Sequence, residues 1–277
     1  MKFQPQRQAA PPSVYYASLT SLARAAVKEA ASGHDCLNII DGAKLVDNYC
    51  SLKSTGLTPL IKAVDMAGEM GNLLADQVEE APFLVFNKPE IVSALDLGID
   101  PAKLAFIAGV KPAPAIKYGL KRGLRVFGGG SVADIDKIGK AKLTTGLSDT
   151  TLDLVLVFDP TDLPSYDTAM QMVEMTYEQG DKLAGISVQS TEPFCDESFA
   201  KTVALSRLVI EASAQKNLLQ GNEKRIIFDI GEVDLNEKNY VKRGEIARKQ
   251  LTGTGVKVGS LSQLCRLLVI KPNILTT

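Results

Sequence analysis

The sequence predicts an α/β protein built as a closed (β/α)8 barrel of the TIM type. Apolar runs recur along the chain, helical patterns separate them, and the whole fits into 277 residues. Strands of a parallel sheet read as unbroken apolar runs, because helices cover the outer face while the interior buries the other. Eight strand–helix units in roughly 230 residues match the length of such a barrel.

The predicted strands are short apolar runs, and the predicted helices have apolar residues at every third or fourth position. A short strand is expected at 36–41, and the eight barrel strands at 58–64, 81–87, 104–110, 124–128, 152–159, 183–189, 225–231 and 266–271. Helices are expected over 89–98, 113–123, 131–141 and 197–215. The alternative is an open, doubly wound sheet, which carries a Gly-rich fingerprint after its first strand. Here that place reads "AVDMAG", so we favour the barrel.

The chain is expected to have three parts. A flexible arm spans 1–13, a helix with a short strand spans 14–42, and the barrel spans 43–277. The tract "QPQRQAAPPS" is rich in Pro and Gln, a composition that does not form an amphipathic helix. No acidic residue precedes Glu29, so a mitochondrial presequence is the alternative to an arm. We favour an arm on a cytoplasmic protein.

Composition excludes several classes of function. The net charge is −1 and the pI about 6.0, so no global positive field favours nucleic acid or anionic membranes. No apolar run approaches the roughly 18 residues of a membrane-spanning helix. Four widely spaced cysteines, Cys36, Cys50, Cys195 and Cys265, indicate reduced thiols rather than a zinc site or disulfides. His34 is the only histidine, so acid–base catalysis by imidazole is not expected.

A glycine run, "GGGSVAD" at 128–134, follows the fourth predicted strand. Ser131 and Asp134 have the spacing of a helix capping box, which is the interpretation we favour. A phosphate site at the helix N-terminus is the alternative, although Asp134 would repel an anion there.

Acidic side chains gather at the ends of the fifth and seventh predicted strands, namely Asp159, Asp162, Asp229, Glu232 and Asp234. Carboxylates at a barrel mouth could hold a polyamine or a metal ion. Without histidines nearby, a solvated rim with local capping is the favoured interpretation, and no metal is expected.

Several strings resemble the ornithine decarboxylase family, which includes the antizyme inhibitors. They are "TPLIKAV" (58–64), "NKPEIVSALDLGIDPAKLAFIAGVKPAPAIKYGLKRGLRVF" (87–127), "AGISVQS" (184–190), "FDIGEVD" (228–234) and "VIKPN" (269–273). The resemblance implies a barrel of the alanine racemase and ornithine decarboxylase N-terminal type. In that family the barrel binds pyridoxal phosphate, and a second β-domain completes the active site.

The resemblance also shows where this chain departs from the family. Six features of the family's cofactor site align with other residue types here. The Schiff-base lysine aligns with Val64, a neighbouring aspartate with Leu84 and an arginine with Val157. The stacking imidazole aligns with Gln189, the phosphate-binding glycines with Glu232–Val233, and the carboxylate at the pyridine nitrogen with Lys271. A protonated pyridine ring is the electron sink of such chemistry, and a lysine opposite its nitrogen opposes protonation. We therefore expect no bound cofactor, no catalytic residues and no decarboxylase activity.

Lys62 is a second lysine in the first predicted barrel strand. It shares a strand face with Val64, because side chains alternate with a period of two. A shifted Schiff base is one interpretation. A buried lysine paired with an acid, or an outward lysine, are the others, and we favour these two over a cofactor role.

The remaining candidate site is the basic segment "KPAPAIKYGLKRGLRV". Lys117 and Lys121 share one exposed helix face, while Ile116 and Leu120 face the sheet. In the resembling family this segment docks antizyme, which implies a protein-binding surface of Lys111, Lys117, Tyr118, Lys121, Arg122, Arg125 and Lys137.

We therefore expect a pseudoenzyme that acts by protein binding, specifically an antizyme-binding regulator of polyamine metabolism. A subunit that partners an active decarboxylase paralogue is a second version. The alternatives are a barrel that binds a polyamine or a phosphate ligand, and a pyridoxal-phosphate protein with altered chemistry.

Overall fold

The computed structural model describes the backbone of residues 37–39, 58–62, 83–107, 111–190, 194–216, 218–219, 227–233, 239–254, 257–262 and 268–270. Side chains are described over 83–107, 111–190, 194–216, 218–219 and 242–254. The chain divides into two compact units, one of Met1–Asp47 with Cys265–Thr277 and the other of Asn48–Leu264.

The smaller unit contains one pair of described strands. β1 (Leu37–Ile39) pairs antiparallel with β10 (Leu268–Ile270), with Asn38 opposite Val269. The strand expected at 36–41 is confirmed. The expectation that 266–271 forms the eighth barrel strand is wrong, because its central residues pair with β1 instead. The helix expected within 14–42 lies outside the described residues.

The larger unit is a closed barrel of eight parallel strands, which confirms the predicted fold class. In order around the barrel they are β2 (Thr58–Lys62), β3 (Phe83–Val85), β4 (Leu104–Phe106), β5 (Val126–Gly129), β6 (Asp153–Phe158), β7 (Lys182–Val188), β8 (Ile227–Val233) and β9 (Lys257–Ser262). β9 closes the barrel by pairing with both β8 and β2. Seven of these strands fall within or beside the expected runs, and β9 was not expected.

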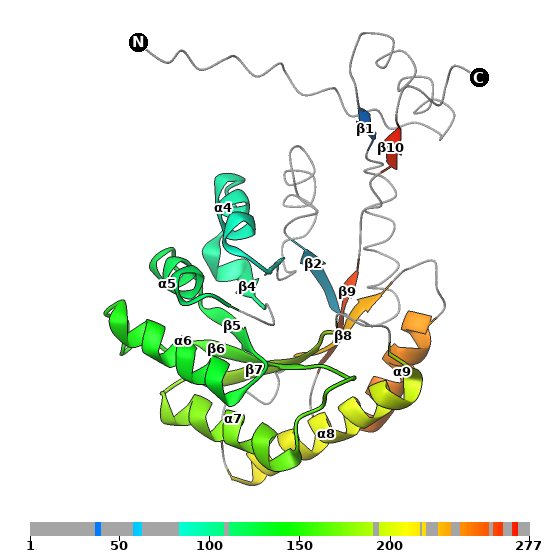
Figure 1. Ribbon diagram of the computed structural model, residues 1–277. Coiled ribbons are helices and arrows are strands. Elements are labelled where there is room, and N and C mark those ends of the chain that lie inside the picture. The colour runs from blue at the N-terminus through cyan, green and yellow to red at the C-terminus, as the bar shows by residue number, and fades with distance from the viewer. Residues whose placement is uncertain are drawn as a thin grey trace, which may run out of the picture. The chain divides into compact units, whose positions relative to one another are not determined.

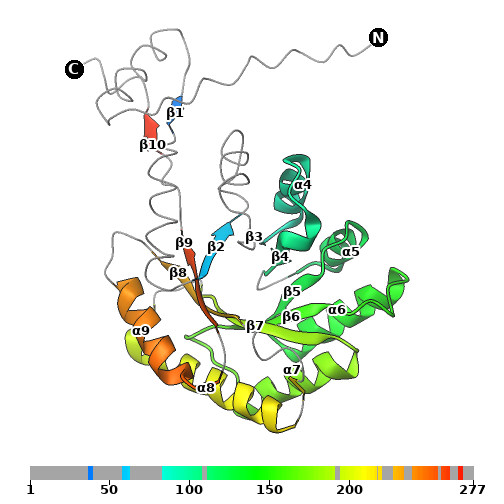
Figure 2. The same cartoon turned by 180° about the vertical axis from the view of Figure 1, so that it is seen from behind.

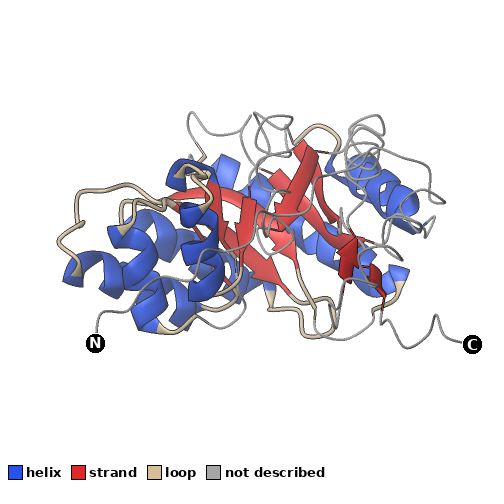
Figure 3. Ribbon diagram, turned by 90° about the horizontal axis from the view of Figure 1, so that it is seen from above, coloured by secondary structure: helices blue, strands red, loops and turns tan. Residues whose placement is uncertain are grey.

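Helices cover the outer side of the strands (Figures 1 and 2). They are α4 (Lys88–Asp96), the 3-10 turn η2 (Pro101–Lys103), α5 (Ala113–Lys121), α6 (Val132–Thr144), α7 (Tyr166–Glu178), α8 (Asp196–Gln215) and α9 (Asn239–Leu251). Seen from above, the strands lie between helices on either side (Figure 3).

Side-chain caps fix where three of these helices begin. Asn87 accepts a hydrogen bond from the Glu90 amide, and Ser131 and Ser165 accept from the third residue after each of them. Such caps satisfy amides that the first helical turn leaves without partners. The capping role predicted for Ser131 is therefore confirmed, with the Asp134 amide 3.2 Å from its hydroxyl.

The long helix α8 satisfies its buried hydroxyl groups internally. Thr202, Ser206 and Ser213 are fully buried, and each donates to the carbonyl four residues earlier at 2.6 to 2.9 Å. A buried hydroxyl costs free energy unless it is hydrogen-bonded. With these bonds made, α8 packs its buried face against the core without leaving these hydroxyl groups unpaired.

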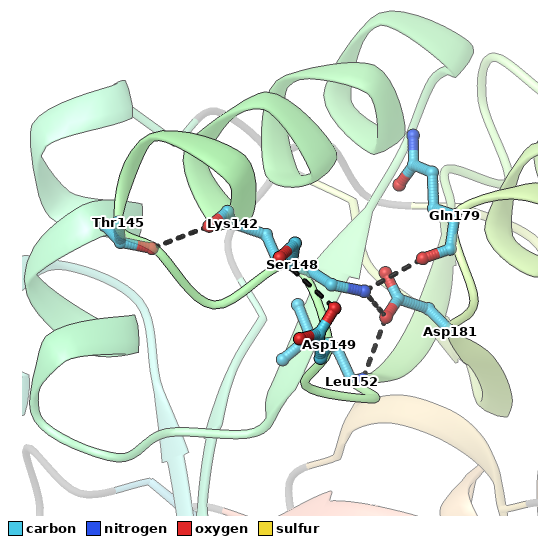
Figure 4. A network of polar contacts seen from close by, with 7 residues as sticks. All are labelled: Lys142, Thr145, Ser148, Asp149, Leu152, Gln179 and Asp181. Atoms are coloured by element: carbon cyan, nitrogen blue, oxygen red, sulfur yellow. Dashed lines mark hydrogen bonds and ion pairs between the residues drawn. The ribbon is translucent and has the colours of Figure 1, made fainter.

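A buried ion pair joins α6 to the amino ends of β6 and β7 (Figure 4). The Lys142 ammonium donates to Asp181 Oδ1 at 2.5 Å and to the Gln179 carbonyl at 2.9 Å. The same Asp181 oxygen accepts the Leu152 amide at 2.9 Å. Both side chains are at most 4% exposed. Burial raises the pKa of Asp181, while the hydrogen bond from Lys142 opposes that change.

Among the described residues, no helix is both long and apolar enough to cross a membrane.

Replacing Asp181 by Asn should destabilise the fold by about 3 kcal/mol, because it leaves the Lys142 charge buried without its partner. The matched control is Asp136→Asn, which breaks the exposed Lys140–Asp136 pair and should cost less than about 0.5 kcal/mol. Urea unfolding measures both changes. Equal, small losses in the two variants would show that the buried pair does not hold these elements together.

Candidate functional site

The interior of the barrel is the first place where a ligand could bind, because small molecules bind at the carboxyl ends of barrel strands. Over β3 to β7 the interior is aliphatic, with a cluster of Leu84, Ala105, Ile107, Val155 and Val157. Phe86, Val126 and Ala184 pack against this cluster. The described interior therefore has the character of a packed core.

Gly128 on β5 lies close to side chains from both sides, Ile107 just after β4 and Val157 on β6. A Cβ at this position would lie 3.0 Å from Ile107 Cγ2 and 3.1 Å from Val157 Cγ2. Both distances are below ordinary van der Waals contact. The interior is thus filled at this level, where even a methyl group would be crowded.

Gln189 crosses the interior near the carboxyl end of β7. Its Nε2 donates to the Ile107 carbonyl on the β4 side at 3.3 Å and to Ser187 Oγ at 3.2 Å. β4 and β7 are separated by two strands in the barrel order. The amide therefore bridges the mouth of the barrel between two distant strands.

The positions predicted to have lost cofactor groups are brought together only in part. Leu84 and Val157 lie in the interior cluster, 1% and 7% exposed, and Gln189 bridges above them. Glu232 and Val233 lie on β8, where only their backbone is described. Val64 and Lys271 lie outside the described residues.

Lys62 is described through its backbone alone. It ends β2 in register with Leu84 of β3. The choice between its alternative roles stays a prediction.

The acidic residues expected at the barrel mouth include one locally satisfied carboxylate. Asp159 Oδ1 accepts hydrogen bonds from the amide and hydroxyl of Thr161 at 2.9 and 2.7 Å. Burial opposes its ionisation, but these bonds outweigh burial and hold the pKa of Asp159 below its usual value. This is local capping, as predicted. Within the described part of the chain, no group of three potential ligand side chains could hold a metal ion.

The basic segment forms an exposed surface on α5 and α4, two helices that lie side by side in Figures 1 and 2. Lys88 Nζ lies 4.8 Å from the ring centroid of Tyr118, and Arg122 Cζ lies 5.2 Å from the same centroid. We call Lys88, Lys117, Tyr118, Lys121 and Arg122 the Tyr118 surface.

Three residues of the predicted surface differ from these five in burial or in their contacts. Lys111 is only 2% exposed, which corrects the expectation that it faces a partner. Arg125 donates to the carbonyl of Leu124 at 3.0 Å, and Lys137 pairs with Asp134 at 3.0 Å. The sequence grouped these residues because they are close along the chain, a pattern that indicates neither their burial nor their partners.

Sequence reasoning missed Lys88. It lies at the start of α4, one strand–helix unit before the basic segment. Consecutive units of a parallel barrel are neighbours in space, so this adjacency could have indicated it.

Comparisons with known proteins address the fold. No protein-family model and no curated protein matches the chain. Solved structures do match. Lysine decarboxylase from Selenomonas ruminantium is 16% identical, with a TM-score of 0.67 over 91% of this chain and 66% of that one. Ornithine decarboxylase from Entamoeba histolytica is 15% identical (TM-score 0.68, 88% of this chain and 71% of that one), and the arginine decarboxylase of Paramecium bursaria Chlorella virus is 13% identical (TM-score 0.68, 88% and 68%). This chain spans about two thirds of the length of each of these proteins.

The chain has the decarboxylase barrel fold. The fold expected from the resemblance is thus confirmed, and at such identities the likeness carries no statement about activity. One matching structure is a complex with PLP and cadaverine, so the fit of pyridoxal phosphate to this barrel can be considered.

The described residues of this decarboxylase-fold barrel do not fit pyridoxal phosphate. Leu84 and Val157 offer no charge or hydrogen bond to a ring or a phosphate group. Gln189 already uses its amide within the protein. Gly128 has no side chain to offer a ligand, and a Cβ there would already crowd Ile107 and Val157. No step of cofactor chemistry can be assigned to these residues.

Lys111 is a buried amine close to the α6 N-terminus. Its Nζ lies 5.7 Å from the ring centroid of Phe106. Burial lowers the pKa of Lys111 from 10.5 to about 8, with Asp134 raising it and Lys137 lowering it further. The unfolded chain therefore binds a proton at this residue over a pH range in which the folded chain does not.

Stability should therefore rise as pH increases from about 8 to 10.5, because the unfolded state binds more protons there. The difference in pKa corresponds to about 3 kcal/mol over the whole range. Lys111→Met should remove this rise, whereas Lys121→Met, which removes an exposed lysine of α5, should keep it. Urea unfolding at several pH values measures the effect. Parallel profiles for wild type and Lys111→Met would contradict the burial of a charged amine.

Proposed function

We propose that this chain is a catalytically inactive relative of the ornithine decarboxylases that acts by binding another protein. The observation that carries the proposal is the combination of an aliphatic interior over β3 to β7 with an exposed basic surface whose cations have no carboxylate partner among the described residues. The partner proposed first is antizyme, which would make the chain a cytoplasmic regulator of polyamine metabolism.

The interior supports the absence of decarboxylase chemistry. Pyridoxal-phosphate decarboxylation needs a charged environment for the ring and a cradle for its phosphate. Over β3 to β7 this barrel offers aliphatic side chains and an amide held between β7 and β4.

The Tyr118 surface supports binding of a protein. Its four cations form no ion pair among the described residues. Three of them are exposed, namely Lys88, Lys121 and Arg122. Cations with no internal partner keep their hydrogen-bond donors for another molecule. The resemblance to the ornithine decarboxylase family implies antizyme as that molecule, because the corresponding segment of the family docks it.

A decarboxylase paralogue is the second candidate partner. The decarboxylase-like barrel supports this version only through its fold, so we rank it below antizyme.

Incubation with pyridoxal phosphate followed by borohydride reduction should leave no stoichiometric adduct, because Leu84 and Val157 in the described interior offer the cofactor neither charge nor hydrogen bonds. Lysine decarboxylase from Selenomonas ruminantium, one of whose structures contains PLP, serves as the positive control. Mass spectrometry of the intact proteins detects the added mass. A stoichiometric adduct on Lys62 would overturn the pseudoenzyme proposal.

Titration calorimetry against antizyme at low salt should give saturable binding, because electrostatic attraction is strongest there. A higher salt concentration should weaken the complex by roughly tenfold, as expected for a contact between opposite charges. If no heat is released at low salt, antizyme is not the partner. Binding that is independent of salt would point away from the basic surface.

A further inference from the structure

The network around Lys142 contains two buried oxygen atoms whose hydrogen-bonding capacity the described residues do not use (Figure 4). Four buried side-chain atoms in the described part of the chain have no hydrogen-bond partner, and two of them, Asp181 Oδ2 and Gln179 Oε1, belong to this one network. Buried polar atoms in native proteins are nearly always bonded, either to the protein or to ordered water. Two such acceptors in one network therefore indicate a common donor.

The Asp181 carboxyl group is kept ionised by the contacts of its other oxygen. Oδ1 accepts from the Lys142 ammonium at 2.5 Å and from the Leu152 amide at 2.9 Å. Protonation would remove the charge that compensates Lys142, whose side chain is only 4% exposed, and a buried charge without a partner is strongly destabilising. Oδ2 is thus an oxygen of a buried carboxylate, the kind of atom that is most costly to leave without a donor.

The Gln179 side chain packs on the same face of α6 as Lys142. Its amide atoms lie 2.5 to 2.6 Å from the place that a Cβ of Gly139 would occupy. Gly139 precedes Lys142 by three residues, and residues three apart lie on one helix face. Helical side chains also lean toward the N-terminus of their helix, so Lys142 extends toward the turn that Gln179 covers. The Gln179 carbonyl accepts from the Lys142 ammonium at 2.9 Å.

The charges and donors of the network define the ligand that fits it. Lys142 and Asp181 compensate each other, so a metal cation would lie beside an ammonium group with no further negative charge to bind. An anion would face two acceptor oxygens. An ammonium has three donors, and the described bonds use two of those of Lys142. A neutral molecule that donates two bonds and accepts one matches this set, and buried water makes about three hydrogen bonds in proteins.

We propose that one buried water molecule is bound in this network, where it donates to Asp181 Oδ2 and Gln179 Oε1 and accepts from the Lys142 ammonium. It joins the end of α7 to α6 and to the backbone before β7. The site belongs to the amino ends of the strands, so it is distinct from the barrel mouth and from the Tyr118 surface. The inference therefore does not depend on whether the chain binds another protein.

A crystal structure of the full chain at high resolution tests the site directly. We expect a water molecule within hydrogen-bond distance of both Asp181 Oδ2 and Gln179 Oε1. A direct hydrogen bond between these two oxygens would mean that a shared proton satisfies them, and a peak with the short coordination distances of a metal ion would identify a cation. Either result overturns the proposal, as does an ordered network in which no water contacts the two oxygens.

Gln179→Met tests the energetic role of the water in solution. The variant removes one acceptor and keeps a side chain of similar length, so the unfolding equilibrium constant should rise about fivefold, as for the loss of one net hydrogen bond. Gln171→Met replaces an exposed glutamine of α7 and should change that constant by less than about twofold. Urea unfolding measures both. Equal constants for the two variants would show that no bound partner depends on Gln179 Oε1.

Gly139→Ala separates the water from the general packing of α6. Alanine normally stabilises a helix relative to glycine, but its Cβ would displace the Gln179 amide. We therefore expect a higher unfolding constant and a smaller amplitude of the ¹⁷O relaxation dispersion of solvent water, which reports long-lived buried water molecules. A lower unfolding constant with an unchanged dispersion amplitude would contradict the proposal, whether or not Gln179→Met folds.

Discussion

The crowding at Gly128, where an added Cβ would press on both Ile107 and Val157, is the constraint on which the described part of the barrel depends. β4, β5 and β6 can close around an aliphatic centre because the middle strand contributes no side chain at this level. Interiors of proteins pack as densely as organic crystals, and at this level even one added methyl group would be crowded. The Gln189 amide completes the arrangement by joining β7 to β4 across the mouth.

Electrostatic interactions in this protein fall into three groups with different consequences. The buried pair of Lys142 and Asp181 links α6 to the backbone before β6 and β7, and its two charges depend on one another. Exposed pairs along α6 and α8 contribute little individually, because water screens them. The cations around Tyr118 belong to neither group, since two of them lie near an aromatic ring and none has an ion-pair partner in the described part of the chain.

The fold could be predicted from the sequence because burial on both faces produces unbroken apolar runs, as in "LDLVLVF" at 152–158. β9 was not predicted because its sequence, "KVGSLS", contains glycine and two serines and is therefore not an unbroken apolar run. The more apolar run that follows it pairs instead with β1. The sequence placed Lys111 on the basic surface because it is close to the other basic residues along the chain, although it is buried. It missed Lys88 because that residue lies one strand–helix unit earlier. The bond from Gln189 to the Ile107 carbonyl joins residues 82 positions apart, and no local pattern encodes such a contact.

The hydroxyl groups of α8 have a consequence for how such a barrel can diverge. Thr202, Ser206 and Ser213 donate to carbonyl groups of their own helix. These hydroxyl groups therefore need no hydrogen-bond partner from the strands beneath α8. Substitutions that change the lumen therefore need no compensating change in the shell at α8. Side chains in the interior of such a barrel can therefore change while the packing of this outer helix is kept.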